Sequence, residues 1–151
     1  MKNQKGFSLI ELLVVVIIIA IIAAIAIPSL LASRRSANEA SAVGSMRTFH
    51  SANFTYMSLQ SPNAFAANAV ALSNADLIDT GFSAAIDGAN DKAGYEWAYT
   101  FAAASPVAYS LTATDAAGAT GLQKGYFINE EGAIRVGAAG ATATATDPVL
   151  P

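Results

Sequence analysis

Hydrophobic positions are concentrated near the start of the chain, where they form one unbroken run. From Leu12 to Ile27, sixteen consecutive residues carry no polar side chain. A helix needs roughly 20 apolar residues, each rising 1.5 Å, to cross the hydrocarbon core of a bilayer. With Phe7, Leu9 and Ile10 added in front, the run reaches that length. The pattern therefore predicts a membrane-spanning helix.

One charged residue stands near the beginning of this run. Glu11 lies between Ile10 and Leu12. A carboxylate in hydrocarbon costs roughly 2.5 to 3.5 kcal/mol on insertion scales. Because sequences rarely keep such a charge without a partner, we expect Glu11 to meet a positive group.

After Pro28 the pattern becomes that of an amphipathic helix. No proline occurs from Ser29 to Ser61, and apolar residues recur there at steps of three and four. We predict one helix from about Ser8 to about Leu59, about 75 Å long at 1.5 Å per residue. Because proline lacks a backbone donor and clashes with the preceding turn, a kink or local loosening is expected at Pro28. The recurring positions are Val43, Met46, His50, Phe54 and Met57.

The second half of the chain predicts an antiparallel sheet after a connector. Side chains alternate between apolar and polar over residues 95–101 and 107–113, which is the period of a half-buried strand. Residues 125–136 form a predicted hairpin that turns near Asn129 to Gly132. Three or four strands would pack an aromatic face on the amphipathic half of the helix, and the tail 137–151 is expected to be an irregular surface segment. The fold class is therefore α+β.

The connector shows turn signals and short helical patterns. Its turns are expected at Pro62-Asn63, Asp79-Thr80-Gly81 and Asp87-Gly88, and its helical turns at 67–72 and 74–78. A further turn is expected at 104–106, between the first two predicted strands.

Composition excludes several kinds of chemistry. The chain of 151 residues has a formal net charge of −3, so a basic patch for nucleic acid is not expected. It contains no cysteine, which removes disulfides, thiolate metal sites and a cysteine nucleophile. His50 is the only histidine, and no nucleophile, phosphate-loop or zinc-protease motif is present. We expect no catalytic residues and no enzyme activity, with His50 as a structural side chain.

The stretch KGFSLIELL, residues 5–13, resembles the processing site of type IV prepilins and of the related type II secretion pseudopilins. Five features coincide at fixed spacing: a basic leader, Gly6, Phe7, Glu11 and a long apolar run. Pro28 also matches the helix-breaking proline of this family, whereas Ala20 stands where many members carry glycine. Residues 29–52 and 126–135 look like segments of small pilin-like proteins from Gram-negative bacteria.

The resemblance implies cleavage between Gly6 and Phe7 by the prepilin peptidase, followed by N-methylation of Phe7. It also implies a long helix, apolar and then amphipathic, packed on a sheet of three or four antiparallel strands. Copies of the chain would pack their apolar helices in a helical filament, assembled by pilus or type II secretion machinery. There the new amino group at Phe7 of one copy would pair with Glu11 of another and set the axial register, because an unpaired buried charge is costly.

The implied route begins as a single-pass protein of the cytoplasmic (inner) membrane of a Gram-negative-type bacterium. It ends in an extracellular pilus or a periplasmic pseudopilus. A pilus subunit is the principal interpretation. A type II secretion pseudopilin and a non-polymerising membrane-anchored binding module remain open. A cleaved signal peptide would have Lys2 and Lys5 as its basic n-region and Ala24-Ile25-Ala26 as its cleavage site. It is disfavoured because Glu11 lies inside the apolar run and because that run exceeds the usual 7 to 15 residues.

No cofactor is required by this interpretation. Some pseudopilins carry calcium, and Asp87, Asn90 and Asp91 supply three oxygen ligands close together, although without the spacing of an EF-hand loop. These residues form a candidate calcium site beside the simpler interpretation as a solvated turn.

The expected organisation has five parts. They are a leader at 1–6, a transmembrane and filament-core half-helix at 7–28, an amphipathic half-helix at 29–60, a connector at 61–94, and the sheet with its tail at 95–151.

Overall fold

The computed structural model describes residues 6–60, 64–88, 91–102, 108–118 and 121–151. The chain divides into two compact units, residues 1–36 and residues 37–151, and each is described by itself. We call residues 37–151 the head. Several predictions lie outside the described residues: the leader residues before Gly6, the turns at 62–63 and 104–106, Asn90, and the strand position of Val107.

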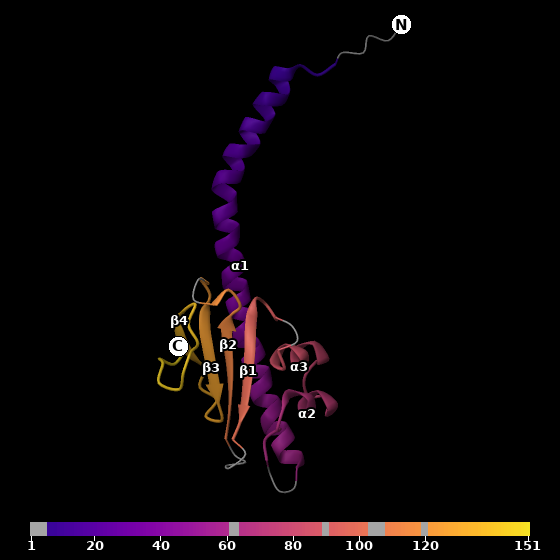
Figure 1. The fold of residues 1–151 in the computed structure, drawn as a ribbon, viewed down its shortest axis with the longest axis vertical. Coiled ribbons are helices and arrows are strands. Elements are labelled where there is room, and N and C mark those ends of the chain that lie inside the picture. Colours follow the sequence, from indigo (N-terminus) through magenta and orange to yellow (C-terminus); the bar gives the residue numbers. More distant parts are fainter. Residues whose placement is uncertain (1–5, 61–63, 89–90, 103–107, 119–120) are drawn as a thin grey trace. The chain divides into compact units, whose positions relative to one another are not determined.

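One helix, α1, covers most of the first third of the chain. It runs from Leu9 to Leu59 and continues through Pro28, which confirms the predicted long helix (Figure 1). Much of its first half is β-branched, and such residues have modest helix propensity in water. In hydrocarbon the backbone groups must be satisfied within the segment, so the helix is the conformation that a single membrane span can take.

In the head, the second half of α1 packs on a sheet. The buried positions of α1 are Ala42, Met46, Phe49, Ala52 and Asn53. The buried face of the helix was therefore predicted with its centre slightly shifted. Met46 is fully buried as expected, but Phe54 is 38% exposed, and the fully buried Phe49 was not among the predicted positions. Asn53 is fully buried because its Oδ1 accepts the backbone N–H of Ala66 at 3.2 Å, which fixes the connector to the helix.

The sheet is a four-stranded antiparallel meander in the order β1-β2-β3-β4. Aromatic rings from β1 and β2 meet rings from α1 and from the connector at edge-to-face angles, including Phe49 with Tyr99 at 5.1 Å and Phe82 with Trp97 at 5.0 Å between centroids. The alternation predicted for Tyr95–Phe101 is confirmed, and so is the hairpin turn, where the Gly132 N–H donates to the Asn129 carbonyl. The strands are β1 (Tyr95–Phe101), β2 (Tyr109–Asp115), β3 (Lys124–Asn129) and β4 (Arg135–Ala139).

The connector holds two short helices, α2 (Ala69–Asn74) and α3 (Thr80–Ile86). The helical turn predicted at 74–78 is wrong, because α2 ends at Asn74 and Asp76 adopts a positive φ of 55°. Asp79, predicted to open a turn, is instead the N-cap of α3, and its Oδ1 accepts the Phe82 N–H at 2.7 Å. Asp79 therefore starts a helix.

The tail is more ordered than the sequence pattern indicates. Val136 N–H donates to the Pro148 carbonyl at 2.9 Å, and Leu150 N–H donates to Ile134 at 2.7 Å. Arg135 Nη1 also donates to the Asp147 carbonyl, at 3.0 Å. The expectation of an irregular surface segment is wrong for residues 137–139, which belong to β4. It holds for residues 140–151, which form no helix or strand but are tied to β4 by these hydrogen bonds and by the isolated bridge between Arg135 and Val149.

Candidate functional site

The junction between Gly6 and Phe7 lies in an accessible, non-helical stretch. Residues 6–8 precede α1, and Phe7 is 86% exposed. A Cβ added at Gly6 would meet nothing within 4 Å. The Ser8 carbonyl accepts the N–H groups of Glu11 and Leu12 at 3.1 and 3.3 Å, which begins the helix directly behind this junction. A peptidase could therefore approach the Gly6-Phe7 bond without unwinding α1, although cleavage there stays a prediction.

Glu11 lies in the first turn of α1. A carboxylate at this end of a helix is favoured by the partial positive charge of the free N–H groups. Its side chain is exposed, and no described residue gives it an ion pair or a hydrogen bond. The charge that is costly in hydrocarbon thus lacks a partner within the described part of its own chain. Its pairing with Phe7 of another copy stays a prediction.

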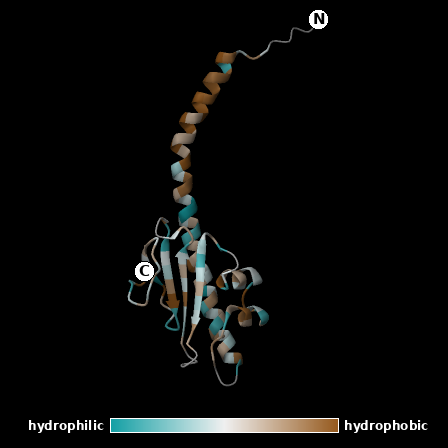
Figure 2. Ribbon diagram, in the orientation of Figure 1, coloured by the Kyte–Doolittle hydropathy of each residue, from teal (hydrophilic) through white to brown (hydrophobic). Residues whose placement is uncertain are grey.

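The surface around Glu11 is strongly apolar. Large apolar side chains from Leu9 to Leu31 are 47% to 83% exposed, and Figure 2 shows this part of α1 as predominantly hydrophobic. The helix contains an 18-residue window with mean hydropathy 3.3, and none of that window is buried. Exposed apolar surface on this scale marks contact with a membrane or with other protein. This unit therefore needs a covering that the described chain does not supply.

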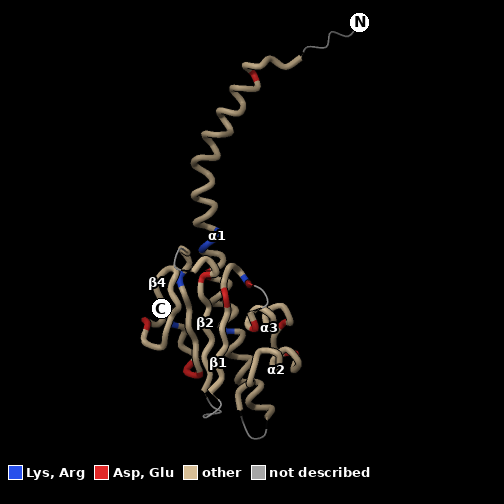
Figure 3. The backbone as a smooth tube through the Cα atoms, in the orientation of Figure 1, with Lys and Arg blue, Asp and Glu red and all other residues tan. Residues whose placement is uncertain are grey.

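Charges are placed only at the two ends of this apolar surface. Figure 3 shows one acidic position near the start of α1 and basic positions after the uncharged stretch. The acidic position is Glu11, and the basic positions are Arg34 and Arg35. No role for the two arginines was predicted from the sequence, although basic residues shortly after an apolar run can mark the end of a membrane span.

His50 lies in the contact between α1 and the sheet. Its Nδ1 is 2.6 Å from the Tyr109 hydroxyl, and its ring packs on Phe54 with centroids 4.7 Å apart. A Cβ at Gly132, which has a φ of +76°, would come within 2.8 Å of His50 Nε2, so the hairpin turn closes over the ring. Burial lowers the pKa of His50, and a hydrogen bond to the Asn129 backbone acts in the opposite direction. These contacts are those of a packing residue.

Of the candidate calcium residues, Asp87 and Asp91 fall within the described chain. Asp87 is the C-cap of α3, whereas Asp91 lines a cavity of about 270 Å³ with Glu96 and Trp97. Asn90 lies outside the described residues. Within the part of the chain that the structure describes, no three histidine or acidic side chains converge. Calcium binding here stays a prediction.

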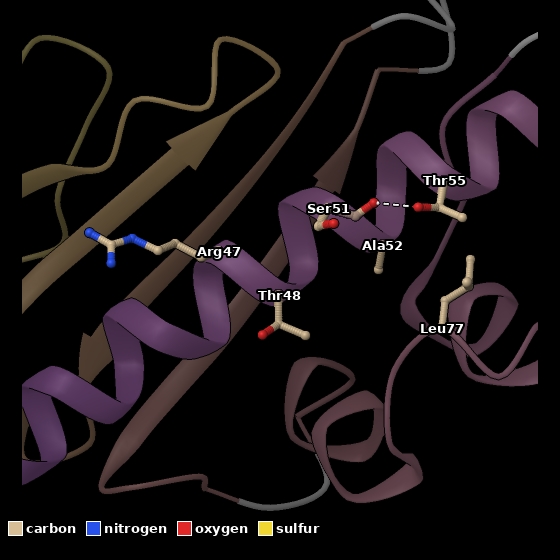
Figure 4. A pocket seen from close by; sticks show the side chains of 6 residues that line it. All are labelled: Arg47, Thr48, Ser51, Ala52, Thr55 and Leu77. Carbon is tan, nitrogen blue, oxygen red and sulfur yellow. Dashed lines mark hydrogen bonds between the residues drawn. The ribbon is translucent and has the colours of Figure 1, made fainter.

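A groove lies beside α1 in the head, where Leu77 of the connector faces the helix (Figure 4). Its volume is about 440 Å³, and it is lined by Arg47, Thr48, Ser51, Ala52, Thr55 and Leu77. Two of its hydroxyls are occupied within the helix, since Thr48 donates to Gly44 at 3.1 Å and Thr55 to Ser51 at 2.9 Å. No set of converging charged groups lines it, so the groove does not resemble a catalytic site.

Comparison with known families assigns the beginning of the chain. Residues 1–27 match the family model for the prokaryotic N-terminal methylation motif. This motif is the hallmark of type IV pilin-like and pseudopilin-like precursors, a structural family and not a known class of enzyme. Comparisons with curated proteins and with solved structures gave no match. The motif therefore supports a prepilin-like precursor, and the long apolar helix found among the described residues is consistent with a membrane anchor.

Proposed function

We propose that this chain is the structural subunit of a type IV pilus. The observation that carries the proposal is the exposed apolar stretch of α1, headed by a methylation motif and by Glu11, which has no ion-pair partner among the described residues. Bilayer lipid would cover this stretch before assembly, and the apolar helices of neighbouring copies would cover it afterwards. Packing between helices of this kind can replace contact with lipid.

Assembly would use two opposite charges near the start of α1, the amino group of Phe7 and the carboxylate of Glu11. Cleavage after Gly6 creates a free amino group at Phe7, which can meet Glu11 of a neighbouring copy. Leaving one member of a buried ion pair without its partner costs about 3 to 5 kcal/mol. A neighbour displaced along the filament axis would meet this penalty, so the pair would select one axial step.

A type II secretion pseudopilin is the second candidate. The methylation motif does not distinguish a pilus subunit from a pseudopilin or from another role. Glu11 and the Gly6-Phe7 junction, as features of subunits that polymerise, favour either one over an anchor that never does. The two differ in what a cell loses without the chain. Loss of long surface fibres supports a pilus subunit, and loss of secretion with fibres intact supports a pseudopilin.

The direct test is the mass and location of the exported chain. Removal of six residues should leave 145, beginning with N-methylated Phe7, and this form should be recovered in sheared fibres. Intact-mass and N-terminal peptide analysis would measure both. A chain that begins at Ile27 would instead indicate signal-peptide cleavage after Ala24-Ile25-Ala26. A processed chain that stays entirely in the membrane fraction would support the anchor.

A further inference from the structure

Arg34 and Arg35 are two positive charges that form no ion pair with a described residue. Arg34 is exposed and Arg35 is half-buried. The ion pairs formed by described residues are Lys92 with Asp79 and Arg135 with Glu131, so neither of these arginines takes part in one. Within residues 1–36 the single acidic residue is Glu11. It lies 23 positions before Arg34, about 34 Å along a helix that rises 1.5 Å per residue.

The spacing between these charges matches a bilayer. Leu12 to Leu31 comprises 20 residues, about 30 Å of helix, which equals the thickness of the hydrocarbon core. With Glu11 at one boundary of that core, Leu31 lies at the other. Arg34 and Arg35 then follow within about 6 Å, which is the depth of the lipid phosphates and within reach of a long side chain.

The conformation of Arg35 agrees with this placement. Its Nε donates to the Leu31 carbonyl at 3.5 Å, so the side chain runs back along α1 toward the apolar stretch. Helical side chains lean toward the N-terminus, which in this helix is the direction of the membrane. The guanidinium of Arg35 is thus held at the level where the apolar surface ends.

We propose that Arg34 and Arg35 bind the phosphates of anionic phospholipids in the leaflet at the outer end of the span, and that this contact fixes how deeply α1 sits. A guanidinium matches a phosphate through two parallel hydrogen bonds and remains charged at all physiological pH values. The inference rests on the membrane-anchored stage of the proposed function. Its consequence is that Glu11 is kept at the opposite boundary of the bilayer, where the amino group released at Phe7 would lie.

Lipid is favoured over an acidic group of a second copy as the binding partner of the arginines, because the subunit contacts lipid before it contacts another copy. A subunit that waits in the membrane already has lipid around Arg34 and Arg35, whereas contact with another copy begins only at assembly. The two arginines also point about 100° apart around the helix axis, at 100° per residue. A surface of lipid phosphates can contact both, while one acidic side chain would contact one of them.

The test uses the full chain in nanodiscs of phosphatidylcholine containing a minority of phosphatidylglycerol. After transfer to mild detergent, native mass spectrometry counts the phosphatidylglycerol that each chain retains. The double variant Arg34→Gln/Arg35→Gln should retain about threefold less than the wild type, because both bidentate contacts are lost. Arg34→Lys/Arg35→Lys should be intermediate, since the charge remains without the fork. Arg47→Gln is the matched control: Arg47 is an exposed arginine of the same helix, farther from the span, and its loss should change nothing.

A second measurement reports depth. The chain has no cysteine, so Ser29→Cys introduces a single thiol near the outer boundary. Its reaction with a membrane-impermeant maleimide should slow in the double glutamine variant, because the outer end of α1 can then sink. Equal lipid retention in wild type and double variant overturns the lipid site. An unchanged reaction rate overturns the control of depth.

Normal retention combined with a loss of filaments would assign the arginines to a neighbouring copy. Because retention is measured on the membrane-bound subunit, it does not depend on filament formation. A wild-type chain that retains its lipid but forms no fibres in cells would count against the pilus proposal alone.

Discussion

Membrane insertion and the proposed filament assembly place opposite requirements on Glu11. In the lone subunit its carboxylate lies beside exposed apolar side chains and lacks a partner among the described residues. In the proposed filament the same carboxylate receives the amino group of Phe7. Insertion is thus helped by removal of the charge, and assembly is harmed by it.

Glu11→Ala should therefore leave membrane insertion intact or slightly improved and should strongly reduce filament yield. The amino group of Phe7 would be left unpaired among apolar helices, at a cost of several kcal/mol. Glu11→Asp should be intermediate, because its carboxylate is one methylene shorter. Membrane-bound subunit and sheared filament are compared for each variant, with Glu96→Ala on the exposed face of β1 as the control. Normal filament yield from Glu11→Ala would show that Glu11 does not set the register.

His50 predicts a pH dependence of the head's stability. Burial keeps its pKa in the folded chain below the usual value of 6.5. As the pH falls through 6.5, the unfolded chain takes up the proton first, and the free energy of unfolding decreases. Stability should be level above this pH and fall below it, toward the folded pKa.

Fluorescence of Trp97, the single tryptophan and 4% exposed, would follow this change during denaturant unfolding of the full chain in detergent. His50→Gln can still accept a hydrogen bond from Tyr109 but cannot titrate. It should remove the step near neutral pH while leaving the changes caused by carboxylates at lower pH. A step of equal size in His50→Gln would assign it to other groups.

At the scale of single elements, α3 depends on its first residue. Asp79 caps this seven-residue helix through its hydrogen bond to the Phe82 N–H and also forms an ion pair with Lys92 at 3.5 Å. Asp79→Ala should reduce the free energy of unfolding by about 1 kcal/mol, as is usual for loss of an N-cap. Asp79→Asn keeps the cap and removes the exposed ion pair, so its effect should be much smaller. Equal effects of both variants, by denaturant titration, would place the contribution in the charge.

The elements that the sequence predicted well are those whose side chains carry a clear period. The alternation in Tyr95–Phe101 placed one face of β1 in the core. The long apolar run, followed by apolar residues at steps of three and four, placed α1. The centre of the amphipathic face was shifted because Ala42, Ala52 and Asn53 have little hydrophobic signal of their own. Asn53 is buried to hydrogen-bond Ala66, a residue 13 positions away.

The hydrogen bonds between the tail and β4 were not predicted, for a related reason. The association of the tail with β4 uses backbone groups of Pro148 and Leu150, which a pattern of side chains does not encode. The candidate site was found differently. Glu11 stood out as a charge within an apolar run, and Gly6 and Phe7 were found through the resemblance to prepilin processing sites. The roles proposed for these residues involve other copies and enzymes outside this chain, which the fold of one chain does not test.

At the scale of the whole molecule, the two units have opposite requirements. Residues 37–151 contain the aromatic core and the sheet, whereas the apolar stretch of α1 lies within residues 1–36 and is exposed. A fragment from Ser33 to Pro151 should therefore be soluble and fold on its own. Its circular dichroism should show both helix and strand, and its thermal unfolding, followed by Trp97 fluorescence, should be cooperative.

Phe49→Ala in this fragment should lower the free energy of unfolding by about 3 to 5 kcal/mol, because it opens a cavity in the aromatic cluster. An aggregated or unstructured fragment would mean that the head needs the apolar half of α1.

The hydrogen bonds between the tail and β4 also bear on how copies of this chain behave when crowded. An uncovered edge strand offers its N–H and C=O groups to any other strand, and it is a common starting point for aggregation. Here the chain's own C-terminus occupies part of that edge through Val136, Ile134 and Arg135. Copies brought close together by their N-terminal helices would thus meet a sheet that is partly closed to intermolecular pairing on the β4 side, which directs association to the helix and away from amyloid-like stacking.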